Sequence, residues 1–119
     1  MTADEFIIYR NIKVKDNQHR KVIELFYPYL RSVSGDERLL PKLLEKYLNM
    51  DLSGVSVVTA CFNGANDGSK PPCDNVDLYI KLSNGVKVFV YGRETKSINP
   101  LNKNEYVINL KASLVRGSR

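Results

Sequence analysis

A chain of 119 residues is long enough for one domain with a hydrophobic core, and 43% hydrophobic with 26% charged residues is typical of globular proteins. No apolar run approaches the roughly 20 residues that span a bilayer, and one histidine with two cysteines cannot supply the four ligands of a structural zinc ion. The net charge of +5 permits an anionic partner, and its excess lies after residue 53, where nine Lys and Arg stand against five Asp and Glu.

The first segment predicts an edge strand or a pair of strands. In residues 6–15, the aliphatic Ile12 and Val14 alternate with polar neighbours, which is the period of a half-buried strand. The N-terminus, MTADEFIIYR, carries acids where a signal peptide has bases, and its apolar stretch is short. We therefore expect a cytoplasmic or nuclear protein.

Two amphipathic helices are predicted next, and a proline limits each of them. Residues 18–33 place apolar side chains at helical spacing, and Pro28 predicts a kink or an end near Tyr27. Residues 37–49 carry a wide leucine stripe. Pro41 fits only in the first turn of that helix, so the helix is expected to start close to it.

A β-branched run and a polar loop follow. Residues 55–63 predict a mostly buried strand. Residues 63–75 are rich in Gly, Asn, Asp and Pro, and we expect a mobile loop there. Cys61 and Cys73 flank this loop. They would be free thiols in a reducing compartment and a disulfide in an oxidising one, and the sequence leaves the two states open.

The stretch 76–92 predicts a central β-hairpin, because two alternating runs flank Ser83-Asn84-Gly85. With Asn84-Gly85 as a two-residue loop, each face would mix apolar and charged side chains. With a three-residue loop, all the aliphatic side chains share one face: Leu78, Ile80, Leu82, Val86, Val88 and Val90. Because a one-residue slip would move this set to solvent, we predict the three-residue loop.

The last part predicts a second loop and a final strand. Residues 95–104 are expected to be mobile, and residues 105–115 alternate as one strand. Consecutive strands without long crossovers imply an antiparallel sheet. We therefore predict a single α+β domain over residues 1–119, with two N-terminal helices packed on one face of a four- to five-stranded antiparallel sheet.

No residue pattern predicts catalysis. His19 lies among polar neighbours and is predicted to be an exposed surface residue. Asp74 and Asp77 flank the start of the hairpin, where acids commonly serve as turn residues. We therefore expect a protein that is not an enzyme and that holds no metal ion and no cofactor.

One surface carries a pattern that suits binding. The second face of the hairpin interleaves aromatic and basic side chains, and the last strand adds a lysine: Tyr79, Lys81, Lys87, Phe89, Tyr91 and Lys111. The same rings can simply pack under a helix or a subunit, with the lysines extending to water. As an interface, such a face fits an adaptor, a homodimer or a complex subunit that works through protein–protein interaction. It also fits single-stranded RNA, whose bases stack on rings while lysines contact phosphates. We favour a protein partner, with nucleic acid as the alternative and no membrane contact.

Short pieces of the chain resemble two known families. LYIKLSNGVKVFVYG is similar to the first motif of Sm-like proteins and LVRG at 114–117 to their second, but the Asp-x-x-Met-Asn segment between them is missing. FYPYL, LLEKYLN and a late YVINL strand are similar to nuclear-transport-factor-like domains, which have a third helix and more sheet. Each resemblance covers only short pieces, so the chain is assigned to neither family.

Overall fold

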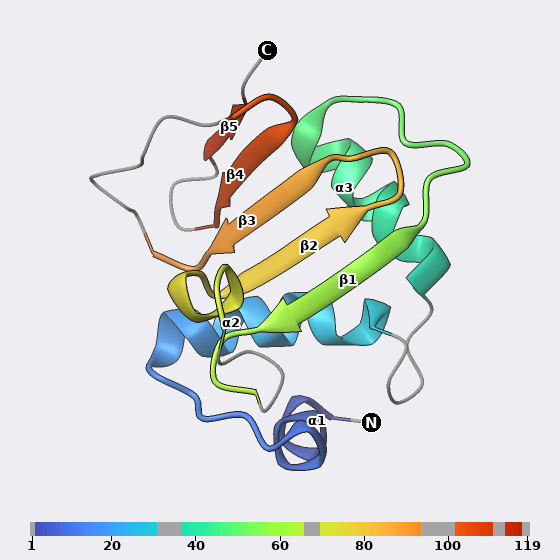
Figure 1. Ribbon diagram of the computed structural model, residues 1–119. Helices are drawn as coiled ribbons and strands as arrows, with labels where there is room; N and C mark the ends of the chain where they lie inside the picture. The colour runs from blue at the N-terminus through green and yellow to red at the C-terminus, as the bar shows by residue number, and fades with distance from the viewer. Residues whose placement is uncertain (1, 31–36, 66–69, 94–101, 111–113, 118–119) are drawn as a thin grey trace.

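The computed structural model describes residues 2–30, 37–65, 70–93, 102–110 and 114–117. Within these residues the chain forms three α-helices and a five-stranded sheet, which confirms the α+β class (Figure 1). The helices are α1 (Ala3–Arg10), α2 (Asn17–Phe26) and α3 (Leu40–Leu48). The strands are β1 (Val57–Phe62), β2 (Leu78–Leu82), β3 (Lys87–Tyr91), β4 (Glu105–Asn109) and β5 (Leu114–Gly117). Short 3-10 turns are η1 (Tyr27–Tyr29), η2 (Glu37–Leu39) and η4 (Cys73–Asn75).

The N-terminal segment begins with a helix, so the predicted edge strand or pair of strands over residues 6–15 is wrong. The Thr2 hydroxyl accepts a hydrogen bond from the Glu5 N–H at 3.1 Å, and the Glu5 carboxylate accepts one from the Thr2 N–H at 2.8 Å. This capping box starts α1. Phe6 anchors the helix, since it is fully buried with its ring centroid 5.7 Å from that of Phe62. A tertiary contact therefore holds a helix too short to be stable alone.

Prolines bound the two predicted helices in the expected places. Helix α2 ends at Phe26 and continues as η1, which contains Pro28, so the predicted end near Tyr27 is confirmed. Pro41 lies in the first turn of α3, where its missing N–H costs no helical hydrogen bond. Residues 31–33 of the first predicted helix lie outside the described residues.

Strands β2 and β3 form the hairpin in the predicted three-residue-loop register. Ile80 lies opposite Val88. The Leu82 N–H donates to the Val86 carbonyl at 2.9 Å, which closes the loop. Gly85 has a left-handed φ of 91°, a conformation that glycine adopts without a steric penalty.

The sheet is mixed, which corrects the predicted antiparallel arrangement. Its order is β1-β2-β3-β4-β5, and β3 pairs with β4 in parallel while the other neighbours are antiparallel. The predicted single strand 105–115 is two strands, β4 and β5. Residues 92–104 are long enough for the return crossing that a parallel pair needs, and the prediction overlooked this. The predicted mobile loops lie partly outside the described residues, at 66–69 and 94–101.

The aliphatic face of the hairpin shares one hydrophobic core with α2 and α3, which lie behind the sheet in Figure 1. This core includes Leu78, Ile80, Leu82, Val86, Val88 and Val90 from the hairpin, and Val22, Ile23, Phe26, Leu40 and Leu44 from the helices. We call this side of the hairpin the inner face. The outer face is the opposite side, made by Tyr79, Lys81, Lys87, Phe89 and Tyr91. None of the described helices combines the length and the apolar character needed to cross a membrane.

Candidate functional site

The register of the hairpin brings the predicted binding residues of β2 and β3 together on the outer face. Tyr79 lies opposite Phe89, with ring centroids 5.4 Å apart. Lys81 lies opposite Lys87. The pleat of β3 places Tyr91 on the same face, two positions after Phe89. The sixth predicted residue, Lys111, lies outside the described residues.

The two ends of the outer face differ in exposure. At the lysine end, Lys81 is exposed and Lys87, its neighbour across the two strands, is half-buried. At the aromatic end Tyr79 is only 7% exposed, because it packs with Cys61, Cys73 and Val76 in one buried cluster. Phe89 and Tyr91 pack against this cluster and are half-buried. The lysine end is therefore open to a partner, and the aromatic end is largely closed.

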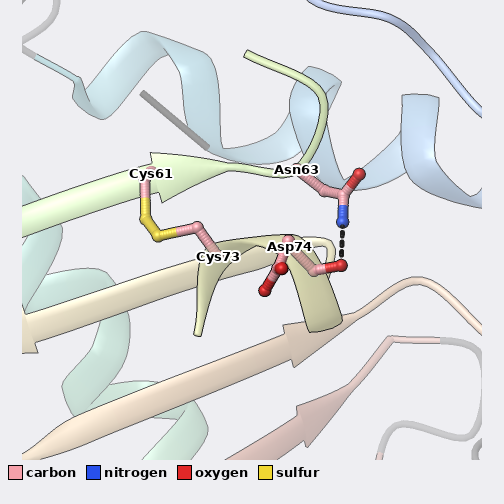
Figure 2. The surroundings of a disulfide bond; sticks show 4 residues. All are labelled: Cys61, Asn63, Cys73 and Asp74. Atoms are coloured by element: carbon pink, nitrogen blue, oxygen red, sulfur yellow. Dashed lines mark hydrogen bonds between the residues drawn. A yellow bond between two sulfur atoms is a disulfide. The ribbon is translucent and has the colours of Figure 1, made fainter. Parts of the chain in front are cut away.

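A disulfide links the residues that pack over Tyr79 to strand β1. Cys61 on β1 and Cys73 on η4 are bonded, with Cα atoms 5.9 Å apart (Figure 2). Beside them the Asn63 side-chain amide donates a 2.9 Å hydrogen bond to the Asp74 carbonyl. Of the two states that the sequence left open, the structure has the bonded one.

Burial and nearby acids raise the pKa of both tyrosines on the outer face. For Tyr79 burial is the larger cause and Glu105 on β4 adds to it, while for Tyr91 burial is followed by Asp77. Both phenols therefore stay neutral at physiological pH. Glu105 also lies beside Lys87 in the parallel pairing of β3 with β4. Local alternation in the sequence does not indicate this acid, because the pairing of β3 with β4 depends on a long connection.

A buried polar cluster lies where the end of β3 meets the start of α2. Asp77 is 3% exposed, accepts a 2.8 Å hydrogen bond from the Gly92 N–H, and lies 3.1 Å from the Lys15 ammonium. The Lys15 N–H donates to His19 Nδ1 at 3.0 Å. His19 is fully buried, so the prediction of an exposed histidine is wrong. Asp77 is likewise a buried ion-pair partner, which the turn pattern in the sequence does not indicate.

The contacts of the buried cluster favour a neutral imidazole. A donor at Nδ1 requires that this nitrogen carry no proton. Burial, the largest cause, lowers the pKa of His19; nearby Asp77 opposes this and Lys15 reinforces it. Helix α2 approaches the end of β3 closely because Gly92 has no side chain, and a Cβ there would collide with the Gln18 carbonyl.

These buried groups assemble no recognisable catalytic arrangement among the described residues. His19 Nδ1 accepts a hydrogen bond from the Lys15 backbone N–H, the His19 backbone N–H donates to the Asp16 carboxylate, and the two cysteines are bonded to each other. A neighbouring pocket of about 280 Å³ is lined by Gln18, Lys21, Gly92 and Leu110, which carry a single charge. No cluster of three or more His, Cys, Asp or Glu side chains in the described ranges could hold a metal ion. The outer face is therefore the candidate site.

The candidate site rests on the geometry of this chain alone. Neither of the two resemblances in the sequence gains support from wider comparison. No protein-family model, no curated protein and no solved structure matches the chain.

Proposed function

We propose that the protein is a non-enzymatic adaptor that binds an acidic protein partner through the outer face. The observation that carries the proposal is the lysine pair, Lys81 opposite Lys87 on adjacent strands. Like charges in a cross-strand pair repel each other, and an anionic group bound across them would relieve this repulsion. Phe89 and Tyr91, both half-buried, offer apolar contact beside the charges.

Charge favours a different chain over a second copy of this one. A two-fold contact centred on the outer face would bring two lysine pairs together. The alternative, single-stranded RNA, depends on rings that are free to stack, and Tyr79 is 7% exposed. With α2 and α3 packed against the inner face, the outer face is left for the partner.

The test is affinity capture with matched charge variants. We expect the unmodified protein to capture a partner that the variant Lys81→Glu/Lys87→Glu does not capture. It should be retained with Lys42→Glu/Lys46→Glu, which makes the same charge change at exposed positions of α3. Circular dichroism would check that both variants fold. Retention by the outer-face variant, or equal loss in both, would contradict the proposal.

Two further measurements separate the alternatives. Binding of a fluorescent single-stranded oligonucleotide that weakens steeply between low and moderate salt would favour nucleic acid, since phosphate contacts release counterions. A dimer in light scattering that dissociates in Lys81→Glu/Lys87→Glu would favour self-association. A monomer that binds no oligonucleotide leaves the separate protein partner.

A further inference from the structure

The residues before β2 form a cover over the aromatic end of the outer face. This cover segment, Cys73–Val76, consists of η4 and the residue that follows it. Val76 is 1% exposed and packs in the same cluster as Cys61 and Tyr79. Cys61 is also the neighbour of Tyr79 in the register of β1 with β2. The cover segment therefore lies over the tyrosine that the outer face would otherwise present.

The disulfide is the cross-link between the cover segment and β1, and the chain itself joins the other end of this segment to β2 through Asp77 (Figure 2). One side-chain hydrogen bond supports it, from the Asn63 amide to the Asp74 carbonyl at 2.9 Å. The Asp74 and Asn75 N–H groups donate to the carbonyls of Lys70 and Pro72, at 3.2 and 3.1 Å. These last two bonds are local turns, which shape the cover segment without attaching it to the sheet.

We infer that the Cys61–Cys73 disulfide is a redox switch that controls whether the aromatic end of the outer face is open to a partner. A dithiol reductant supplies two electrons and two protons, so that the S–S bond breaks, two thiols form and the dithiol becomes a disulfide. Reduction removes a cross-link between residues 12 apart in sequence, and the freed cover segment can leave Tyr79. Oxidising and reducing compartments then favour different states. Control of partner binding by this switch rests on the proposed function, whereas the opening of the cover segment on reduction does not.

Opening changes the chemistry that the outer face offers. With the cover segment in place, a partner meets the lysine pair and two half-buried rings. Without it, Tyr79 joins Phe89 on the contact surface, with the two rings 5.4 Å apart at 43°. Buried aromatic contacts contribute most of the energy of typical interfaces. The reduced form therefore suits an acidic segment that also carries an aromatic or aliphatic side chain.

Tyrosine nitration followed by peptide mass mapping tests the opening. We expect Tyr79 to react several-fold faster in Cys61→Ser/Cys73→Ser than in the disulfide-bonded protein. Tyr9, which is 63% exposed and lies on α1, should react equally in both and serves as the internal control. Equal rates at Tyr79 in the two proteins would overturn the inference.

Hydrogen exchange provides a second test that needs no cysteine variant. In the unmodified protein, dithiothreitol should speed exchange at the Asp74 and Asn75 amides while Ile80 and Val88 stay protected. Equal loss of protection at all four would overturn the inference, because the disulfide would then hold the whole fold. Asn63→Ala should speed reduction by about fivefold, the equivalent of one hydrogen bond.

Partner capture separates this inference from the proposed function. Reduction of the disulfide should strengthen capture of the partner by the unmodified protein, and the variant Lys81→Glu/Lys87→Glu should not capture that partner. Faster nitration of Tyr79 with capture insensitive to both lysines would refute the proposed function and leave the switch standing. Slow nitration with lysine-dependent capture would refute the switch and leave the proposed function standing.

Discussion

The inner and outer faces of the hairpin are alternate residues of the same two strands, yet they differ in almost every property. The inner face carries six aliphatic side chains, none more than 5% exposed: Leu78, Ile80, Leu82, Val86, Val88 and Val90. The outer face mixes rings with lysines and runs from the buried Tyr79 to the exposed Lys81. Because a one-residue slip would exchange the two faces, burial of the inner face determines the register.

The geometry of the outer face follows from the packing of the inner face. Lys81 lies opposite Lys87 because Ile80 lies opposite Val88, and not because the two lysines attract each other. Chemistry on the outer face can therefore serve binding at little cost to folding. Variants of adjacent residues can test this separation.

The largest effect is expected from Ile80→Ala, which removes methyl groups from the inner face. Ile80 is fully buried, so the variant should lose about 2–5 kcal/mol of unfolding free energy. Its exposed neighbour provides the control, because Lys81→Ala should change stability by about 0.5 kcal/mol or less. Urea denaturation followed by circular dichroism measures both. Similar losses in the two variants would show that the faces do not differ as described.

The next effect concerns the close approach of α2 to the end of β3. In Gly92→Ala the new Cβ would collide with the Gln18 carbonyl and lie 3.1 Å from Val22 Cγ2. Because the colliding atom is backbone and cannot rotate away, we expect a loss of about 2–3 kcal/mol. Gly54→Ala is the control, since its Cβ meets nothing within 4 Å and only its φ of 74° opposes the change. That strain should cost about 1 kcal/mol. A smaller loss at residue 92 than at residue 54 would argue against the close packing.

Local patterns were sufficient to predict the hairpin and both helix limits. The alternation around Ser83-Asn84-Gly85 identified the register, since only one register buries all the aliphatic side chains. Pro28 and Pro41 restrict helices through their own ring geometry, whatever surrounds them. These features depend on residues close in sequence, which is why the sequence revealed them.

Features set by distant residues were missed. The alternation of Ile12 and Val14 suggested a strand, whereas Phe6 is held in a helix by Phe62, far along the chain. A local signal was missed as well, since Thr2 and Glu5 have the spacing of a capping box. The parallel pairing of β3 with β4 depends on a connection with no periodic pattern of its own.

The candidate site was predicted in part for the same reason. The register placed Tyr79 against Phe89 and Lys81 against Lys87. The cover over Tyr79 comes from a disulfide-bonded segment, which alternation along β2 cannot reveal. Burial of His19 likewise follows from the packing of α2 on the sheet, and its polar sequence neighbours pointed the other way.

A pH-dependent loss of stability is expected from His19, one of the buried polar groups near the end of β3. Burial lowers its pKa below the ordinary 6.5. Between these two pKa values the unfolded chain binds more protons, so the unfolding free energy falls as the pH falls. This stabilising contribution is fully present above about pH 6.5 and is lost as the pH drops through the pKa of the folded state.

His19→Asn isolates this effect, because asparagine offers an acceptor near the Nδ1 position and does not titrate. The carboxyl groups titrate in both proteins, so the difference in unfolding free energy between them reports the imidazole. We expect this difference to shrink from pH 7 to pH 5 in denaturation experiments. A constant difference over that range would contradict the burial of a neutral histidine.

The smallest effect is expected on the outer face and has the opposite sign. Lys81→Glu replaces a repulsive cross-strand pair with an attractive one, so it should raise the unfolding free energy by about 0.5 kcal/mol. Lys42→Glu makes the same charge change on α3, and 1 M salt should remove a gain that comes from the pair. An equal gain in both variants, or a gain that survives salt, would point to net charge instead. A variant that folds better and captures its partner less well would show that the lysine pair serves binding, because stability alone would favour the substitution.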